Sequence, residues 1–305
     1  MYKVFIDGSA GTTGLKIFNR LSSRKDLTLL TLPEELRKDV SARKDALNSA
    51  DVSFLCLPDV ASKETINLIE NDKVVIIDTS TAHRTADGWA YGFSELSSQK
   101  EKILNSKRIA NPGCHASGFI ALVRPLIESG LIEKDIDLSC YSLTGYSGGG
   151  KKMIESYGNN RPISYEAPRQ YGLTQNHKHL PEMKVLTGLD KEPIFCPVVA
   201  PYIQGMQVTV PLFKSQIKGN VLDIKETLKN AYQGKVVKYL DVSEEGFISA
   251  NAFANKDSMA ISVYGNEDRI LLVATYDNLG KGASGAAIQN MNIVLGLDET
   301  LGLNL

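Results

Sequence analysis

The sequence predicts an α/β protein in which a Rossmann-type parallel-sheet domain is followed by an α+β domain with a mixed or antiparallel sheet. Short apolar runs alternate with helical patterns in the first third of the chain, as they do in βαβ units. A glycine-rich turn directly follows the first run, and beyond about residue 135 strand-like runs follow one another with few helices between them. We expect a first domain over 1–113, completed by a C-terminal helix from 279–305, and a second domain over 114–278.

The first domain is predicted from apolar runs of strand length. They are rich in Val, Ile, Leu and Phe and occupy 2–6, 27–32, 52–57 and 74–77, with a further strand over 107–110. Such continuous runs are typical of parallel strands that are buried on both faces. Between them, apolar residues recur at helical spacing, namely Leu15, Phe18 and Leu21, and then Ile66 and Ile69. The alternation predicts right-handed crossovers that cover both faces of one parallel sheet.

The second domain is predicted to open with a helix at residue 114, whose apolar face ends near Gly130. A turn-rich stretch separates an expected strand over 136–144 from later runs. Those runs occupy 194–200, 206–213, 236–242, 259–264 and 270–276, with one helix near 221–233. The tail over 282–296 is a predicted helix with a face of small residues, which we expect to pack back on the first domain.

The composition argues against a nucleic-acid-binding, membrane-spanning or secreted protein. The chain of 305 residues has a net charge of -1, which gives no electrostatic reason to expect nucleic acid or an anionic membrane as a partner. No apolar run approaches the 18 or so residues of a membrane span. The first strand begins at residue 2, so we expect no secretory signal. The four cysteines are far apart, which favours a reducing, cytoplasmic location.

A glycine-rich loop follows the first strand and opens a helix. It contains the candidate cofactor-binding residues Gly8, Ser9, Gly11, Thr12, Thr13 and Gly14. Such a loop brings a pyrophosphate close to the N-terminus of the helix, where amide groups and the helix dipole favour anions. Glu34 lies about where an acid would bind the ribose of NAD. Four basic residues close to it could instead hold the 2′-phosphate of NADP, so these residues leave the choice between NAD and NADP open: Arg37, Lys38, Arg43 and Lys44.

Cys114 lies in the motif Asn111-Pro112-Gly113-Cys114-His115, at a predicted helix N-terminus. An ordinary cysteine has a pKa near 8.5, so only roughly 3% is thiolate at pH 7. The helix dipole and a nearby imidazolium lower this pKa, and a decrease of about two units raises the thiolate share more than tenfold. We interpret Cys114 as a nucleophile. Cys56, Cys140 and Cys196 are interpreted as small buried residues.

Two further motifs supply candidate partners for this thiol. His177 and His179 precede Glu182 in a chain with only four histidines, which predicts an acid/base site and leaves a zinc site as an alternative. Pro181 suits the first position of a helix, so we expect a helix over 182–186 just after His179. Ser80 and Arg84 follow the strand over 74–77. Because ligands of open α/β sheets bind beyond the carboxyl ends of strands, these two residues are candidate phosphate contacts.

Taken together, these motifs resemble the N-acetyl-γ-glutamyl-phosphate reductase family, the arginine-biosynthetic branch of the semialdehyde dehydrogenase superfamily, and within it the compact type 2 subgroup. The resemblance runs nearly from end to end. Besides the segments above it includes residues 89–96 (Trp-Ala-Tyr-Gly-Phe-Ser-Glu-Leu), 177–182 (His-Lys-His-Leu-Pro-Glu) and 277–285 (Asp-Asn-Leu-Gly-Lys-Gly-Ala-Ser-Gly). One departure is visible, because many members of the family follow the cysteine with Tyr-Pro-Thr, whereas this chain has His115-Ala116-Ser117.

The resemblance implies NADPH as cofactor, an acyl-phosphate substrate (N-acetyl-γ-glutamyl phosphate) and a homodimer or homotetramer. It implies a thioester on Cys114, with His179 as proton donor supported by His177 and Glu182, and no metal. It places Asn278 near the nicotinamide and adds Ser147 and Gly148 to the cofactor contacts and Asn111 to the substrate contacts. Aspartate-semialdehyde dehydrogenase and carrier-linked aminoadipate reductase remain alternatives, as do an NADP-binding sensor without catalysis and a zinc hydrolase. The obvious anchors for the far end of a substrate are Lys151, Arg161 and Arg169.

Overall fold

The computed structural model describes residues 1–241 and 246–305, which divide into two compact units. Unit 1 contains 1–94, 98–112 and 283–303, and unit 2 contains 95–97, 113–282 and 304–305. Each is built on its own sheet, one parallel and one mixed. The predicted fold class is confirmed. In the two described parts of the chain, no helix has both the length and the apolar character of a membrane span.

Unit 1 is a parallel sheet with the strand order β2-β1-β3-β4-β6-β5. Its strands are β1 (Tyr2–Asp7), β2 (Leu27–Leu30), β3 (Val52–Leu55), β4 (Val75–Asp78), β5 (Ala90–Tyr91) and β6 (Arg108–Ala110). Its helices are α1 (Thr12–Leu21), the 3-10 helix η1 (Glu34–Leu36), α2 (Val40–Ser49), α3 (Asp59–Ile66), α4 (Gln99–Leu104) and α9 (Gly285–Val294). The expected strands are present, and no end is shifted by more than two residues.

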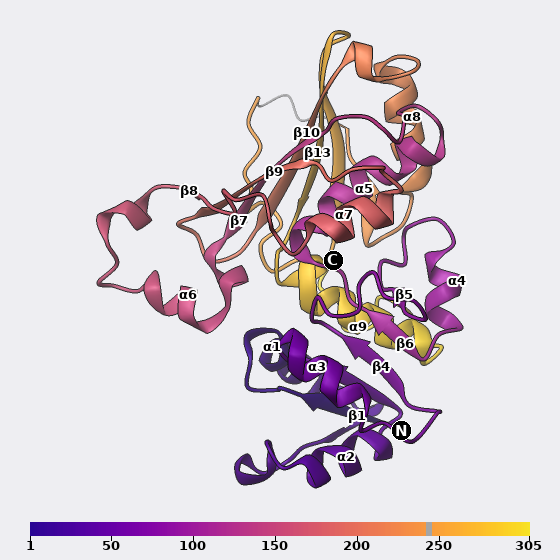
Figure 1. Cartoon of the computed structure of the whole chain (residues 1–305), viewed down its shortest axis with the longest axis vertical. Coiled ribbons are helices and arrows are strands. Elements are labelled where there is room, and N and C mark those ends of the chain that lie inside the picture. The colour runs from indigo at the N-terminus through magenta and orange to yellow at the C-terminus, as the bar shows by residue number, and fades with distance from the viewer. Residues whose placement is uncertain (242–245) are drawn as a thin grey trace. The chain divides into compact units, whose positions relative to one another are not determined.

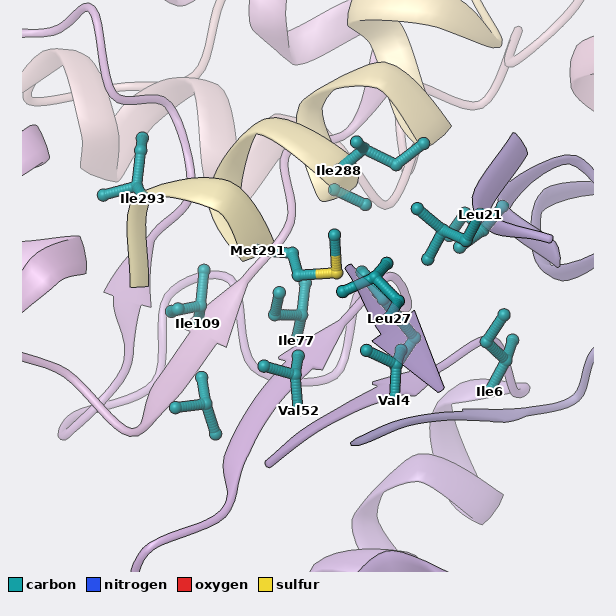
Figure 2. Packing of buried hydrophobic residues seen from close by; sticks show 14 of the residues in the cluster. Val4, Ile6, Leu21, Leu27, Val52, Ile77, Ile109, Ile288, Met291 and Ile293 are labelled. Carbon is teal, nitrogen blue, oxygen red and sulfur yellow. The ribbon is translucent and has the colours of Figure 1, made fainter. Parts of the chain in front are cut away.

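Alternate residues of the central strands fill two separate cores. Val4 and Ile6 of β1 pack in one core, to which α9 contributes Ile288 and Met291, whereas Phe5 packs in the core on the opposite face. Figure 2 shows the α9 side chains facing those of the strands, and Figure 1 shows α9, drawn in yellow, beside β6. The C-terminal helix therefore covers part of the sheet that the N-terminal third of the chain forms.

Unit 2 is a mixed sheet with the order β11-β12-β13-β10-β7-β9-β8. Its strands are β7 (Ser139–Gly145), β8 (Arg169–Gln170), β9 (Ile194–Ala200), β10 (Met206–Phe213), β11 (Val237–Tyr239), β12 (Met259–Gly265) and β13 (Arg269–Tyr276). Its helices are α5 (Cys114–Glu128), η2 (Tyr146–Gly149), α6 (Gly150–Ser156), η3 (Ile163–Glu166), α7 (Leu180–Thr187), η4 (Lys214–Gln216) and α8 (Val221–Ala231). A π-helical turn, η5 (Gly280–Ser284), precedes α9.

The turn-rich stretch contains more regular structure than the sequence predicts. It holds α6 and the short strand β8, which pairs antiparallel with β9. The strand expected over 236–242 is shorter, and residue 242 lies outside the described residues. The helix expected over 182–186 is α7, which has Pro181 in its first turn and His179 as its N-cap residue. The His177–Glu182 motif therefore lies where the sequence predicts, at a helix start.

Candidate active site

The glycine loop of unit 1 has the backbone that close approach of a ligand requires. Gly8 has a φ of +84°, and a Cβ there would lie 2.3 Å from the carbonyl oxygen of Cys56. A Cβ on Gly14 would lie 2.4 Å from the carbonyl oxygen of Gly8. Gly11 is the N-cap residue of α1 and provides no side-chain cap, so the first-turn amides keep the anion-binding character of a helix N-terminus. The loop therefore fits the pyrophosphate of a dinucleotide.

The basic residues near this loop are not equivalent. Arg43 forms an ion pair of 2.8 Å with Asp7 and donates to the hydroxyl of Thr65 over 2.6 Å. Lys44 pairs with Glu70. The remaining candidates for this region are exposed: Glu34, Arg37 and Lys38. Two of the four basic residues that the sequence singles out, Arg37 and Lys38, are thus exposed, and their contact with a 2′-phosphate stays a prediction.

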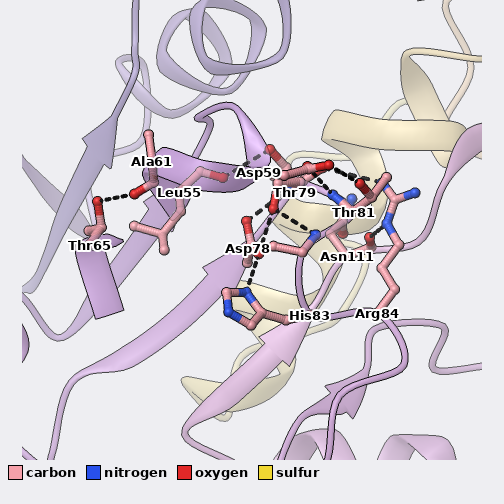
Figure 3. A network of polar contacts seen from close by, with 12 residues as sticks. Leu55, Asp59, Ala61, Thr65, Asp78, Thr79, Thr81, His83, Arg84 and Asn111 are labelled. Atoms are coloured by element: carbon pink, nitrogen blue, oxygen red, sulfur yellow. Dashed lines mark hydrogen bonds and ion pairs between the residues drawn. The ribbon is translucent and has the colours of Figure 1, made fainter. Parts of the chain in front are cut away.

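Asp78, at the end of β4, organises the loop that carries Ser80 and Arg84. Its fully buried carboxylate accepts hydrogen bonds from the backbone N–H and the hydroxyl of Ser80, at 2.9 and 2.8 Å, and contacts Nδ1 of His83 at 2.6 Å. The His83 ring stacks on Trp89 with 4.1 Å between centroids. Figure 3 shows Asp78 at the centre of this network. The Ser80 hydroxyl is therefore held by Asp78.

Arg84 and Asn111 belong to the same network (Figure 3). Arg84 donates from Nε to the carbonyl of Asn111 over 3.0 Å and from Nη2 to the carbonyl of Thr79 over 3.3 Å. The fully buried Asn111 donates from its amide to the carbonyl of Ala283 over 3.0 Å and accepts from Asn290 over 3.3 Å. The predicted substrate contacts lie together in unit 1, where these bonds tie them to its framework. Their contact with substrate stays a prediction.

In unit 2, Cys114 is the first residue of α5, and its side chain is half-buried. The preceding Gly113 is the N-cap residue, and its N–H donates to Oε1 of Glu182 over 2.7 Å. Glu182 is almost fully buried. It therefore fixes the turn before the cysteine, and its support of the acid/base step stays a prediction. The thiol lies at a helix N-terminus, as predicted.

Three histidines form a cluster in unit 2, and one of them, His115, directly follows Cys114 in the sequence. The ring of His115 lies 5.8 Å from that of His177 and 5.6 Å from that of His179, between centroids, and the rings of His177 and His179 are 4.8 Å apart. Phe195 packs against His115 and His177 at 5.3 and 5.0 Å. The structure thus brings together the two histidines of the motif and adds His115, which stands where the sequence departs from the family pattern.

The cluster strongly disfavours charge on two of its members. Burial, reinforced by His177, lowers the pKa of His115 to about 3. Burial, with a smaller effect of Lys178, lowers the pKa of His177 to about 4. Nδ1 of His177 accepts the backbone N–H of His179 over 3.3 Å, which agrees with a neutral ring. At neutral pH both His115 and His177 are therefore uncharged.

Tyr171 and Ser142 belong to this site although the sequence does not single them out. Nδ1 of His115 lies 2.6 Å from the Ser142 hydroxyl, and Nε2 lies 2.7 Å from the Tyr171 hydroxyl. Burial raises the pKa of Tyr171, and the nearby Cys114 raises it further. Tyr171 therefore stays protonated close to the thiol. In the sequence, only its position six residues before His177 connects Tyr171 with the histidine motif.

The predicted cofactor contacts of unit 2 also lie together. The amide of Asn278 donates to the Ser147 hydroxyl over 3.0 Å and accepts from the N–H of Gly205 over 3.0 Å. A Cβ on Gly148 would lie 3.3 Å from the same amide nitrogen. These bonds fix the side chain of Asn278, and its contact with a cofactor stays a prediction. In the described ranges, no group of three or more His, Cys, Asp or Glu side chains is placed to hold a metal ion.

Comparison with protein families gives two matches that cover most of the chain. Residues 3–105 match the family model described as semialdehyde dehydrogenase, NAD binding domain, and residues 114–278 match semialdehyde dehydrogenase, dimerisation domain. Two curated relatives, from Brucella ovis and Brucella suis biovar 1, carry the name N-acetyl-gamma-glutamyl-phosphate reductase. Each is 45% identical to this chain over 306 residues and covers 96% of this chain and 99% of the relative.

Solved structures show the same fold at low sequence identity. Aspartate semialdehyde dehydrogenase II from Vibrio cholerae has a TM-score of 0.72 and 16% identity, covering 97% of this chain and 99% of that chain. Aspartate semialdehyde dehydrogenase from Candida albicans, solved with NADP, has a TM-score of 0.71 and 14% identity, with 97% and 99% covered. At this identity the likeness concerns the fold alone.

Proposed function

Because this chain belongs to the semialdehyde dehydrogenase family, we propose that it reduces N-acetyl-γ-glutamyl phosphate with NADPH to N-acetylglutamate 5-semialdehyde and phosphate, a step of arginine biosynthesis. The observation that carries the proposal is the position of Cys114. It opens α5 behind a turn pinned by Glu182, in the unit that also holds the histidine cluster. The 45% identity to reductases of this name supports the choice of substrate.

Cys114 provides the nucleophile of the reaction. Its thiolate attacks the acyl carbon, and the new C–S bond forms as the C–O bond to phosphate breaks, which gives a thioester and releases phosphate. Bound NADPH supplies the hydride that reduces the acyl carbon. Gly8, Ser9, Gly11, Thr12, Thr13 and Gly14 are the residues proposed to hold its pyrophosphate. Asn278, with Ser147 and Gly148, is proposed to orient its nicotinamide.

His179 is our candidate for the proton transfer. It donates a proton to the oxygen of the thiohemiacetal as that species forms, and takes the proton back as the aldehyde forms and the thiolate leaves. The lowered pKa of His177, about 4, supports this division of labour, because a neutral His177 has no proton of an imidazolium to give near pH 7. His177 then serves as the hydrogen-bond acceptor that orients the backbone of His179.

Arg169 is the candidate for binding the substrate carboxylate. Its guanidinium lies 3.3 Å from the ring centroid of Tyr165 and donates to the Tyr157 hydroxyl over 3.0 Å. Among the described residues it has no carboxylate partner, whereas Arg161 pairs with Glu166. An arginine that is oriented by aromatic rings and keeps its charge available suits a carboxylate. Ser80, Arg84 and Asn111 remain the predicted contacts of the phosphoryl end.

Replacing Arg169 with lysine is expected to raise KM for the acyl phosphate roughly tenfold while kcat changes less, because lysine keeps the charge and loses the bidentate geometry. Steady-state kinetics measure the split. Arg161→Lys provides the matched control, since Arg161 already has a carboxylate partner. An unchanged KM in Arg169→Lys, together with a raised KM in the control, would transfer the proposed role to Arg161.

The open face of the mixed sheet supports a homo-oligomer. Strand register places a row of partly exposed residues on one face, opposite the face against which α5 packs: Tyr141, Ile194, Pro211, Phe213 and Leu271. An apolar sheet face of this kind is typical of a subunit interface. Residues 114–278 match a dimerisation domain. We assign this face to a homodimer, which a tetramer would contain twice.

A reducing compartment suits the proposed chemistry, because a half-buried thiol must stay reduced to act as a nucleophile. We therefore also propose a cytoplasmic location.

The reaction run backwards tests the substrate assignment. The protein is mixed with NADP, phosphate and either N-acetylglutamate semialdehyde or aspartate semialdehyde, and NADPH formation is followed by absorbance. We expect turnover with the first aldehyde and little with the second. Turnover with aspartate semialdehyde alone would overturn the substrate and keep the mechanism, whereas none with either aldehyde would contradict the enzymatic function.

A further inference from the structure

One tyrosine hydroxyl joins the end of β13 to the first turn of α5. Oη of Tyr276 donates to the carbonyl oxygen of Cys114 over 2.5 Å and accepts the N–H of Gly118 over 3.0 Å. These two backbone groups are four residues apart, which is the pair that an α-helix joins directly. The hydroxyl therefore bridges the helical turn that carries the candidate nucleophile.

The space around the Tyr276 hydroxyl and the first turn of α5 is closely packed, so that no side chain fits at Gly118 or Gly282 without displacing a neighbour. A Cβ on Gly118 would lie 2.7 Å from Oη of Tyr276 and 2.6 Å from Cγ2 of Val208. A Cβ on Gly282 would lie 3.0 Å from Cβ of Cys114. The Tyr276 side chain is fully buried, and burial holds its pKa well above the ordinary value. The hydroxyl thus keeps the proton that it donates to the Cys114 carbonyl.

We infer that Tyr276 is a positioning residue for Cys114, whose hydroxyl sets the opening turn of α5 and with it the environment of the thiol. The inference deepens the proposed function and rests on Cys114 as its nucleophile. The turn is then held on both sides of the thiol. Glu182 of α7 binds the N–H of Gly113, and Tyr276 of β13 binds the carbonyl of Cys114.

The physical reason is that a thiolate gains from a helix N-terminus only within the first turn, where the amides are close to it. Without the hydroxyl, the Cys114 carbonyl loses its side-chain donor inside the core, and the first turn of α5 loses its tie to β13. The first turn of α5, then held by its own helical bonds alone, shifts against β13. That movement displaces Cys114 relative to the histidine cluster.

The test is Tyr276→Phe, which removes one oxygen from the buried ring. Two quantities are measured: kcat and KM in the forward reaction, and the pH dependence of Cys114 alkylation by iodoacetamide, followed by mass spectrometry of its peptide. We expect kcat to fall roughly 10- to 100-fold with little change in KM, as for small misplacements of reacting groups. The alkylation midpoint should rise by about half a pH unit.

Tyr232→Phe is the matched control. Tyr232 is also buried, and its hydroxyl donates to the carbonyl of Ala121 on the same helix over 2.7 Å. Its removal should lower the melting temperature and leave kcat and the alkylation midpoint unchanged. If Tyr276→Phe behaves as this control does, Tyr276 has only a structural role and the inference is wrong.

A second variant tests the inference independently, and the wild-type protein tests the proposed function. Should Tyr276→Phe fail to fold, Gly118→Ala displaces the same hydroxyl with a methyl group, and an unchanged midpoint and kcat in that variant would equally overturn the inference. A wild-type alkylation midpoint at the value of an ordinary cysteine would contradict the activated nucleophile itself. That result refutes the proposed function, whichever way the Tyr276 variant behaves.

Discussion

Replacing Cys114 with serine is expected to reduce turnover by at least roughly a thousandfold, because a serine hydroxyl has no comparable anion at neutral pH and no other group can form the thioester. Steady-state assays in both directions measure the loss. A second readout follows the intermediate: wild-type protein quenched in acid during turnover should carry the mass of the acyl group on the Cys114 peptide, and the variant should not.

Cys196→Ser is the control for this variant. Cys196 is half-buried on β9, on the open face of the mixed sheet, and has no part in the proposed mechanism. NADPH binding, measured by fluorescence, should be the same in both variants, since the glycine loop belongs to unit 1. Full activity of Cys114→Ser would rule out the covalent mechanism. A wild-type protein that binds NADPH and turns over no aldehyde would favour the sensor.

The sequence predicts the parts of the fold in which pattern and environment agree. The central strands β1, β3 and β4 of unit 1 are buried on both faces over most of their length, so their apolar runs stand out against the polar turns between them. Gly113 directly precedes the helix that begins at Cys114, and Pro181 lies in the first turn of α7, so both residues mark a helix start. In each case a local rule and the tertiary contacts lead to the same structure.

The turn-rich stretch shows where such rules fail. This stretch is expected to contain turns, yet Gly149 and Gly150 open α6. A Cβ on Gly149 would lie 2.5 Å from the sulfur of Met153 in that helix. Strand β8 has only two residues and exists because β9 lies beside it. Its pairing partner lies about thirty residues away in the chain, so no local pattern reveals it.

Some residues of the candidate site can be found from a sequence motif, and others can be found only from the structure. Cys114, His177 and His179 are residue types that carry chemistry, so a motif is enough to find them. Tyr276 lies 162 residues from Cys114 and, within an apolar strand, is typical of an ordinary core residue. Arg43 has the charge to hold a phosphate, but its partner Asp7 is 36 residues away. Position in three dimensions, rather than residue type, decides these roles.

Replacing His179 with asparagine is expected to lower kcat by about 10²- to 10⁴-fold, the range for loss of a general acid, with Cys114 alkylation largely retained. His177→Asn is the matched comparison, because an asparagine side chain can keep the acceptor that binds the backbone N–H of His179. Its kcat should fall much less. Since the pKa of His177 is about 4, the pH profile of kcat between pH 6 and 8 should keep its shape in this variant.

The same pKa fixes the sign of a stability effect of His177. His177 binds a proton near pH 6.5 in the unfolded chain and only near pH 4 in the folded one. The unfolded state therefore binds more protons between these values, and the wild-type protein loses stability as the pH falls from 6.5 toward 4. His177→Asn removes its part of that loss, so its melting temperature should fall less steeply with acidification. A variant series in which His177→Asn abolishes turnover and His179→Asn does not would exchange the two roles and leave Cys114 as the nucleophile.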